Sequence, residues 1–152
     1  THIGRPAPDF SVPASRVWAK QDFKFTSVKG YPVFLHFWAT WCGPCLQELP
    51  ELLKLAEAQR PKGVTFIAVA IDQSWNDLEK FFAQYPHLRP LTERMVVILD
   101  PDSEIANKFG SSRFPETFLI NEAMLIDNKF VGAQDWSDPR VETFLKALRT
   151  AP

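Results

Sequence analysis

The sequence has few of the features that would tie it to a membrane or a nucleic acid. Its 17 basic and 18 acidic residues leave a formal net charge of −1. That balance gives no electrostatic reason to expect nucleic acid or an anionic membrane as a partner. The apolar runs are too short to cross a bilayer, and no signal peptide is visible. Because the chain begins at Thr1 rather than Met, we also consider that an N-terminal signal or anchor has been removed.

Cysteine and histidine are scarce as well. The chain has two cysteines and three widely scattered histidines, His2, His36 and His87. A zinc site needs four ligands, and these scattered residues do not suggest one. Neither a metal nor an organic cofactor is expected. A structural disulfide between Cys42 and Cys45 would close too short a loop to constrain the unfolded chain much. The scarcity therefore favours a redox role for this pair.

The two cysteines stand between an apolar run and a helical pattern. Residues 33–38 predict a buried strand, and a helix is expected to follow the cysteines to about Gln59. Cys42 is then placed at the mouth of that helix, where unpaired N–H groups and the helix dipole favour a thiolate. The pKa of the Cys42 thiol is expected below the free value of about 8.5. Cys45 is expected to be the shielded thiol that resolves a mixed disulfide formed by Cys42.

Two residues between the cysteines fit the same interpretation. Pro44 suits the first turn of a helix, because its missing N–H costs nothing there. Gly43 lets a partner chain approach the sulfur closely.

Residues 37–45, Phe-Trp-Ala-Thr-Trp-Cys-Gly-Pro-Cys, resemble the active-site segment of the thioredoxin superfamily. The Ala39-Thr40 pair and the longer chain resemble its TlpA/ResA-like branch, also known as redoxin or AhpC/TSA. The resemblance runs from Gly4 to about Leu148. It implies a single α/β domain over residues 1–152 with the thioredoxin fold. A central mixed β-sheet would be flanked by helices, with an N-terminal extension and an inserted strand-helix segment.

Hydrophobic periodicity places the other elements of that fold. Asp72 and Ser74 offer capping groups for a helix over residues 75–84. Met124 stands where the family has glycine, so the turn at 121–124 is expected to be distorted or longer. The remaining predicted elements are strands over 23–26, 64–71, 95–99 and 125–131, a helix over 103–109, and a final helix that begins after Asp138-Pro139.

The resemblance also implies a second site segment opposite the cysteines. Pro115 occupies the place of a cis-proline, and the backbone of Phe114 would be free to pair with an extended substrate. The alternative is a trans proline that opens a strand. Together with Trp41, Gly43 and Pro44, these residues are expected to form the substrate-contact surface.

Two further residues have alternative interpretations. His36 stands where thioredoxins carry a buried carboxylate, so it either relays a proton to or from Cys45 or is a satisfied core histidine. Glu48 lies one turn beyond Cys45. It either modulates the cysteines, as a glutamate here does in the ResA-like branch, or is a solvated helix carboxylate.

The resemblance implies a thiol–disulfide oxidoreductase that acts on protein substrates and exchanges electrons with an upstream redox partner. The expected role is that of a monomeric reductase in apocytochrome c maturation or general periplasmic thiol reduction. Its expected location is the periplasm, free or membrane-anchored, with the cytoplasm as the alternative.

Two other functions stay open at this stage. A peroxiredoxin-like peroxidase would have proline and threonine at fixed offsets before its reactive cysteine, where this chain has Leu35 and Ala39. A metal-binding module such as a copper chaperone would need a histidine in a mobile loop near the cysteines, and His87 is the candidate.

Overall fold

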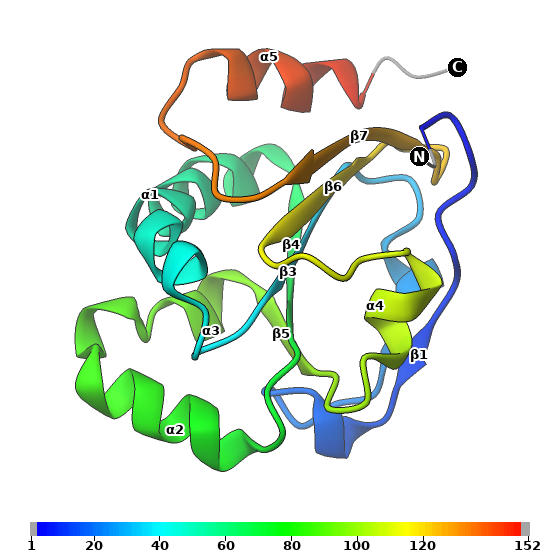
Figure 1. The fold of residues 1–152 in the computed structure, drawn as a ribbon. Helices are drawn as coiled ribbons and strands as arrows, with labels where there is room; N and C mark the ends of the chain where they lie inside the picture. Colours follow the sequence, from blue (N-terminus) through cyan, green and yellow to red (C-terminus); the bar gives the residue numbers. More distant parts are fainter. Residues whose placement is uncertain (1–2, 150–152) are drawn as a thin grey trace.

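A mixed five-stranded sheet forms the centre of the protein (Figure 1). The computed structural model describes residues 3–149, so His2 lies outside the described residues. The strand order is β5-β4-β3-β6-β7, with β3, β4 and β5 parallel and with β6 and β7 each antiparallel to its neighbour. The strands are β3 (Val33–Trp38), β4 (Thr65–Ala70), β5 (Val96–Leu99), β6 (Glu116–Ile120) and β7 (Ile126–Val131). This is the α/β architecture that the sequence predicts.

Helices cover both faces of the sheet, which explains why β3 is buried along its whole length. Alternate residues of β3 face opposite layers: Trp38 packs on Phe81, whereas Phe37 packs on Phe109. Figure 1 shows α1 and α2 on one side of the sheet and α4 on the other. The helices are α1 (Gly43–Gln59), α2 (Trp75–Gln84), α3 (Leu91–Arg94), α4 (Glu104–Lys108) and α5 (Arg140–Ala147).

The N-terminal segment runs along both borders of this sheet. Its short strands β1 (Ser11–Val12) and β2 (Phe23–Lys24) pair with each other. Before them, the N–H of Gly4 donates to the carbonyl of Ile126 at the start of β7. After β1, the N–H of Trp18 donates to Val97 O, and Val17 forms a bridge with Ile98 of β5. The same chain segment therefore hydrogen-bonds to both edge strands.

Several sequence expectations differ from the structure in detail. The strand expected over 23–26 ends at Lys24, because the chain turns into the 3-10 helix η2 (Phe25–Val28). Met124 adopts a left-handed conformation with φ 65°, and the β6–β7 register shifts at Leu119/Ile120, so the distortion expected in this turn is confirmed. The insertion between β4 and β5 contains α3 and the 3-10 helix η4 (Pro86–Leu88) in addition to α2.

Candidate active site

The two cysteines lie at the N-terminus of α1 and form a disulfide. Cys42 is the N-cap residue, and its Sγ accepts a hydrogen bond from the N–H of Cys45 at 3.3 Å. A sulfur in this position takes the place of the side-chain oxygen that usually caps a helix. Pro44 occupies the first turn, as expected. Cys45 is fully buried, whereas Cys42 is 7% exposed, so the attacking and shielded positions predicted from the sequence fit the two burials.

A tight turn connects the end of β3 to α1 and contains Cys42. The N–H of Cys42 donates to the carbonyl of Ala39 at 3.2 Å, which closes a four-residue turn. Trp41 is 67% exposed at the tip of this turn. Thr40 is bonded to the carboxylate of Asp72 through its N–H and its hydroxyl. Ser74 is the N-cap residue of α2, as the sequence predicts, but its side chain makes no cap bond. The predicted capping by Asp72 is wrong, because Asp72 bonds to Thr40.

The segment opposite the cysteines contains the expected cis bond. The peptide bond between Phe114 and Pro115 is cis, so the cis alternative is confirmed. The carbonyl oxygen of Phe114 lies 3.7 Å from Cys42 Sγ. Phe114 is half-buried and Pro115 is buried. The expected contact surface is therefore corrected: its exposed part consists of Trp41 and the residues at 43–44, with Phe114 at the border and Pro115 beneath.

Glu48 is a buried acceptor rather than a solvated helix carboxylate. It is 3% exposed, and its Oε2 accepts hydrogen bonds from Trp136 Nε1 at 2.7 Å and from the N–H of Gln134 at 3.0 Å. Both donors come from the loop between β7 and α5. A buried carboxylate is tolerated when it accepts such bonds, and this loop supplies them.

His36 connects Glu48 with the sheet. The imidazole is fully buried, and its Nε2 lies 3.0 Å from Glu48 Oε1, close enough for an ion pair although without the alignment of a hydrogen bond. On the other side, Nδ1 lies 2.8 Å from the hydroxyl of Thr117 on β6. The sequence placed His36 and Glu48 near the cysteines separately. The structure brings them together as a buried acid–base pair.

Glu116 is a site residue that sequence reasoning missed. Its carboxylate accepts hydrogen bonds from the N–H groups of Ser112 and Arg113, both at 2.7 Å, and lies 3.3 Å from Lys129 Nζ. These bonds hold the backbone that leads into the cis peptide. An acidic residue at the start of an apolar strand, directly after Pro115, is the signal that could have identified it.

The pKa of Glu116 follows from these contacts. Burial raises the pKa of this carboxyl, but the bonds from Arg113 and Ser112 and the charge of Lys129 outweigh burial. The net result is a pKa below the ordinary value of 4.5. The stabilisation that this carboxylate provides is therefore complete above 4.5 and is lost as the pH falls through the lowered folded-state pKa.

Replacing Glu116 with glutamine is expected to destabilise the protein by about 2 kcal/mol at pH 7, since two charge-assisted hydrogen bonds weaken. The difference from wild type is expected to shrink as the pH falls below 4.5 and through the lowered folded-state pKa of Glu116, because the wild-type carboxylate then becomes protonated. Urea unfolding at several pH values measures both effects. Glu104→Gln, at an exposed carboxylate of α4, is the control. A pH-independent difference would contradict this role for the charge.

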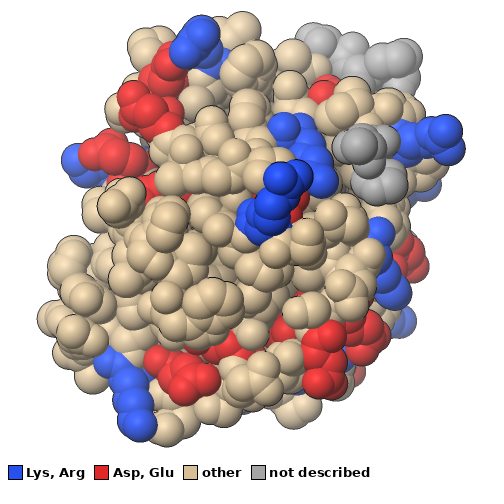
Figure 2. Space-filling model, in the orientation of Figure 1, with Lys and Arg blue, Asp and Glu red and all other residues tan. Residues whose placement is uncertain are grey.

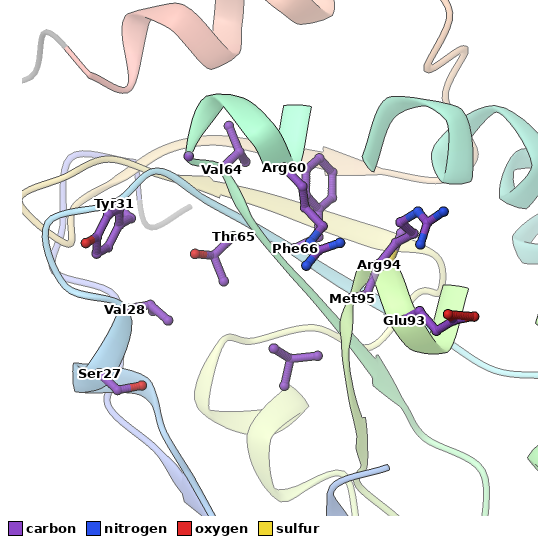
Figure 3. A pocket seen from close by; sticks show the side chains of 12 residues that line it. Ser27, Val28, Tyr31, Arg60, Val64, Thr65, Phe66, Glu93, Arg94 and Met95 are labelled. Carbon is purple, nitrogen blue, oxygen red and sulfur yellow. The ribbon is translucent and has the colours of Figure 1, made fainter. Parts of the chain in front are cut away.

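Other parts of the described structure do not join this site. A cavity of about 440 Å³ lies at the starts of β4 and β5, the end of the parallel strands opposite the cysteines (Figure 3). Arg60, Arg94 and Tyr31 are among its lining side chains, and neither cysteine is.

Within residues 3–149, no group of three His, Cys, Asp or Glu residues is arranged to hold a metal ion. His87 is exposed in η4, next to Tyr85. In the same range, no helix is long and apolar enough to span a bilayer.

Comparison with known proteins gives one consistent family. The AhpC/TSA family model matches residues 3–129. The thiol-disulfide oxidoreductase ResA of Bacillus anthracis is 31% identical over 146 residues, which are 96% of this chain and 78% of that protein. ResA of Bacillus subtilis strain 168 is 31% identical over 118 residues, or 78% of this chain and 61% of that protein.

Solved structures agree with this relationship. A thiol:disulfide interchange protein DsbE from Chlorobium tepidum superposes with a TM-score of 0.81 at 29% identity and covers 97% of both chains. StoA from Bacillus subtilis superposes with a TM-score of 0.70 at 24% identity and covers 91% of this chain and 99% of its own, a likeness of fold. The chain therefore belongs to the AhpC/TSA family within the thioredoxin superfamily, and it is a ResA-like thiol–disulfide oxidoreductase.

Proposed function

We propose that Cys42 is the attacking thiol and Cys45 the resolving thiol in disulfide exchange with protein substrates. The observation that carries this assignment is the position of Cys42 Sγ at the N-cap of α1, where it accepts the N–H of Cys45. In the reduced protein the same N–H and the helix dipole favour a thiolate. The complete burial of Cys45 keeps the second thiol away from external disulfides until Cys42 has reacted.

The exchange consists of two balanced steps. The Cys42 thiolate attacks one sulfur of a substrate disulfide, that disulfide breaks, and the departing sulfur takes a proton. Cys45 then loses its proton and attacks Cys42 Sγ, which breaks the mixed disulfide and releases the second substrate sulfur, again with a proton. The substrate gains two electrons and two protons, and the protein is left with the Cys42–Cys45 disulfide seen in the structure.

The surroundings of Cys42 suit an extended protein segment. Residues 39–47 carry no charged side chain, and Figure 2 shows few charged residues on this face over the start of α1. Trp41 provides exposed apolar area beside the sulfur. The carbonyl of Phe114, close to Cys42 Sγ, can accept a hydrogen bond from a substrate backbone. Such a small apolar surface favours transient binding.

We assign to the pair of His36 and Glu48 the role of accepting the proton of the Cys45 thiol. Glu48 lies one helical turn beyond Cys45, and its carboxylate faces His36 Nε2. A buried thiol needs a nearby base before it can attack, because water cannot reach it. The pair accepts that proton in the second step and releases it when the disulfide is reduced again.

The direction of electron flow and the location belong to the same proposal. We assign a monomeric reductase outside the cytoplasm, supplied with electrons by an upstream redox partner. The Gly43-Pro44 dipeptide between the cysteines resembles that of reducing members of the superfamily. Apocytochrome c maturation or general thiol reduction would provide its protein substrates.

The reduction potential of the Cys42–Cys45 couple tests this direction. Equilibration with glutathione of known ratio is expected to give a potential near the value of about −270 mV typical of thioredoxin. A value near about −120 mV, as in strongly oxidising relatives, would reverse the assigned direction. A peroxide assay without an added thiol partner separates the peroxidase alternative, because the oxidoreductase is expected to consume no peroxide catalytically.

A further inference from the structure

The turn that carries Cys42 leaves one backbone donor without a partner inside the turn. In this turn Ala39 provides the carbonyl and Cys42 the N–H of the closing bond. Thr40 occupies the second position, and the N–H of that residue points out of a closed turn. A donor in this part-buried position needs a partner, since an unpaired backbone group would destabilise the turn.

Asp72 supplies that partner from the neighbouring strand. In the parallel register of β3 and β4, Trp38 pairs with Ala70, and the N–H of Ile71 donates to Trp38 O at 3.0 Å. The next residue, Asp72, therefore lies beside the turn. The N–H of Thr40 is 3.1 Å from Oδ1 and 3.3 Å from Oδ2 of Asp72, and the Thr40 hydroxyl donates to Oδ2.

Burying the Asp72 carboxylate costs free energy, which indicates that its contact with Thr40 has a functional role. Asp72 is 1% exposed, and within residues 3–149 no lysine, arginine or histidine forms an ion pair with it. Burial raises the pKa of Asp72; the two bonds from Thr40 oppose that rise, and the charge of Asp77 on α2 adds to it. A buried acid without a cation is energetically costly, and within residues 3–149 the hydrogen bonds that the Asp72 side chain accepts from other residues come from Thr40.

We propose that Asp72 is a positioning residue for disulfide exchange, because it fixes Thr40 and thereby the turn that holds Trp41 and Cys42 beside the Phe114 carbonyl. This inference rests on the proposed role of Cys42 as the attacking thiol. Without the bonds between Asp72 and Thr40, the turn samples other conformations and the sulfur of Cys42 leaves the N-cap position. Misplacement of a reacting atom by about 1 Å can slow a reaction by up to about a hundredfold.

A double-mutant cycle tests this role of the contact between Asp72 and Thr40. The variants are Thr40→Val, Asp72→Ala and the double variant, with Thr40→Ser as the conservative replacement that keeps the hydroxyl. Asp102→Asn is the matched control, since Asp102 is an exposed carboxylate on the loop before α4. The readouts are the rate of reaction of reduced protein with an aromatic disulfide and with insulin, and the pH dependence of Cys42 alkylation, all well below each variant's melting temperature.

We expect Thr40→Val and Asp72→Ala each to slow both reactions about tenfold and to shift the alkylation profile to higher pH. The double variant is expected to be no slower than Asp72→Ala, because Asp72→Ala already removes the hydroxyl bond that Thr40→Val removes, together with the two N–H contacts. Thr40→Ser and the control are expected to react within about twofold of wild type. If Asp72→Ala does not fold, the comparison of Thr40→Val with Thr40→Ser still decides the matter.

Two results overturn the inference. One is a folded Asp72→Ala variant that reacts and ionises like wild type or, where that variant does not fold, a Thr40→Val variant that does so. The other is an additive effect in the double variant. Either would leave the proposed function intact. In contrast, a wild-type protein whose Cys42 is no more reactive than an ordinary thiol would contradict the proposed function itself.

Discussion

Replacing Cys45 with serine is expected to stop turnover and to leave protein substrates bound to Cys42 through a mixed disulfide. Cys45 is fully buried beside Cys42, so it is the group placed to break that intermediate. Serine fills nearly the same space but cannot attack a disulfide, so turnover is expected to fall by about a thousandfold or more. Non-reducing electrophoresis measures the trapped complex, and insulin reduction measures turnover.

Cys42→Ser is the matched control for this experiment. It is expected to lose turnover without trapping any substrate, because the remaining thiol has no access to an external disulfide. If Cys42→Ser trapped substrates and Cys45→Ser did not, the roles of the two cysteines would have to be exchanged.

Replacing Glu48 is the second change with a large expected effect. Glu48→Ala leaves the indole N–H of Trp136, the N–H of Gln134 and the ring of His36 buried without their partner. The expected loss of unfolding free energy is about 3 kcal/mol, in the range seen when one member of a buried pair is removed. Urea unfolding at pH 7 measures it.

Glu48→Gln separates stability from chemistry. The amide oxygen can still accept from Trp136 and Gln134, so this variant is expected to fold. Because the pair proposed to receive the Cys45 proton loses its carboxylate, we expect slower resolution of the mixed disulfide, by about a hundredfold, and a changed pH profile. His36→Asn is expected to change the same profile. Stopped-flow measurement of the second exchange step over a range of pH gives both quantities.

Glu51→Gln provides the control on the same helix. Glu51 pairs with Lys54 at the surface, at 3.3 Å, and such exposed pairs contribute little. If Glu48→Gln and Glu51→Gln behaved alike, or if His36→Asn kept the wild-type profile, the buried pair would have no part in proton transfer.

Patterns within one segment predicted the main elements. The apolar run at 33–38 and the periodicity after Cys45 gave β3 and α1 with correct bounds, because burial on both faces or on one face leaves a local repeat. The cis bond before Pro115 followed from the motif and its resemblance. These features depend on neighbouring residues or on a short, specific motif.

Contacts between distant segments could not be predicted in the same way. Helical spacing placed Glu48 one turn from Cys45, but its burial depends on Trp136, which follows 88 residues later. Asp72 has the chemistry of a helix cap and lies shortly before Ser74, the N-cap residue of α2, yet its carboxylate bonds to the turn at Thr40, 32 residues earlier. Local capping and tertiary bonding compete for the same oxygen atoms, and only the packed structure decides between them.

The backbone bonds of the N-terminal segment to β5 and β7 also affect how the molecule meets its neighbours. An uncovered edge strand exposes unpaired N–H and C=O groups that can recruit a strand from another copy. Here Val17 and Trp18 occupy part of the β5 edge, and Gly4 occupies the beginning of the β7 edge. The N-terminal segment thus covers part of each edge against such strand pairing, and Trp41 stays exposed where another chain can make favourable contact.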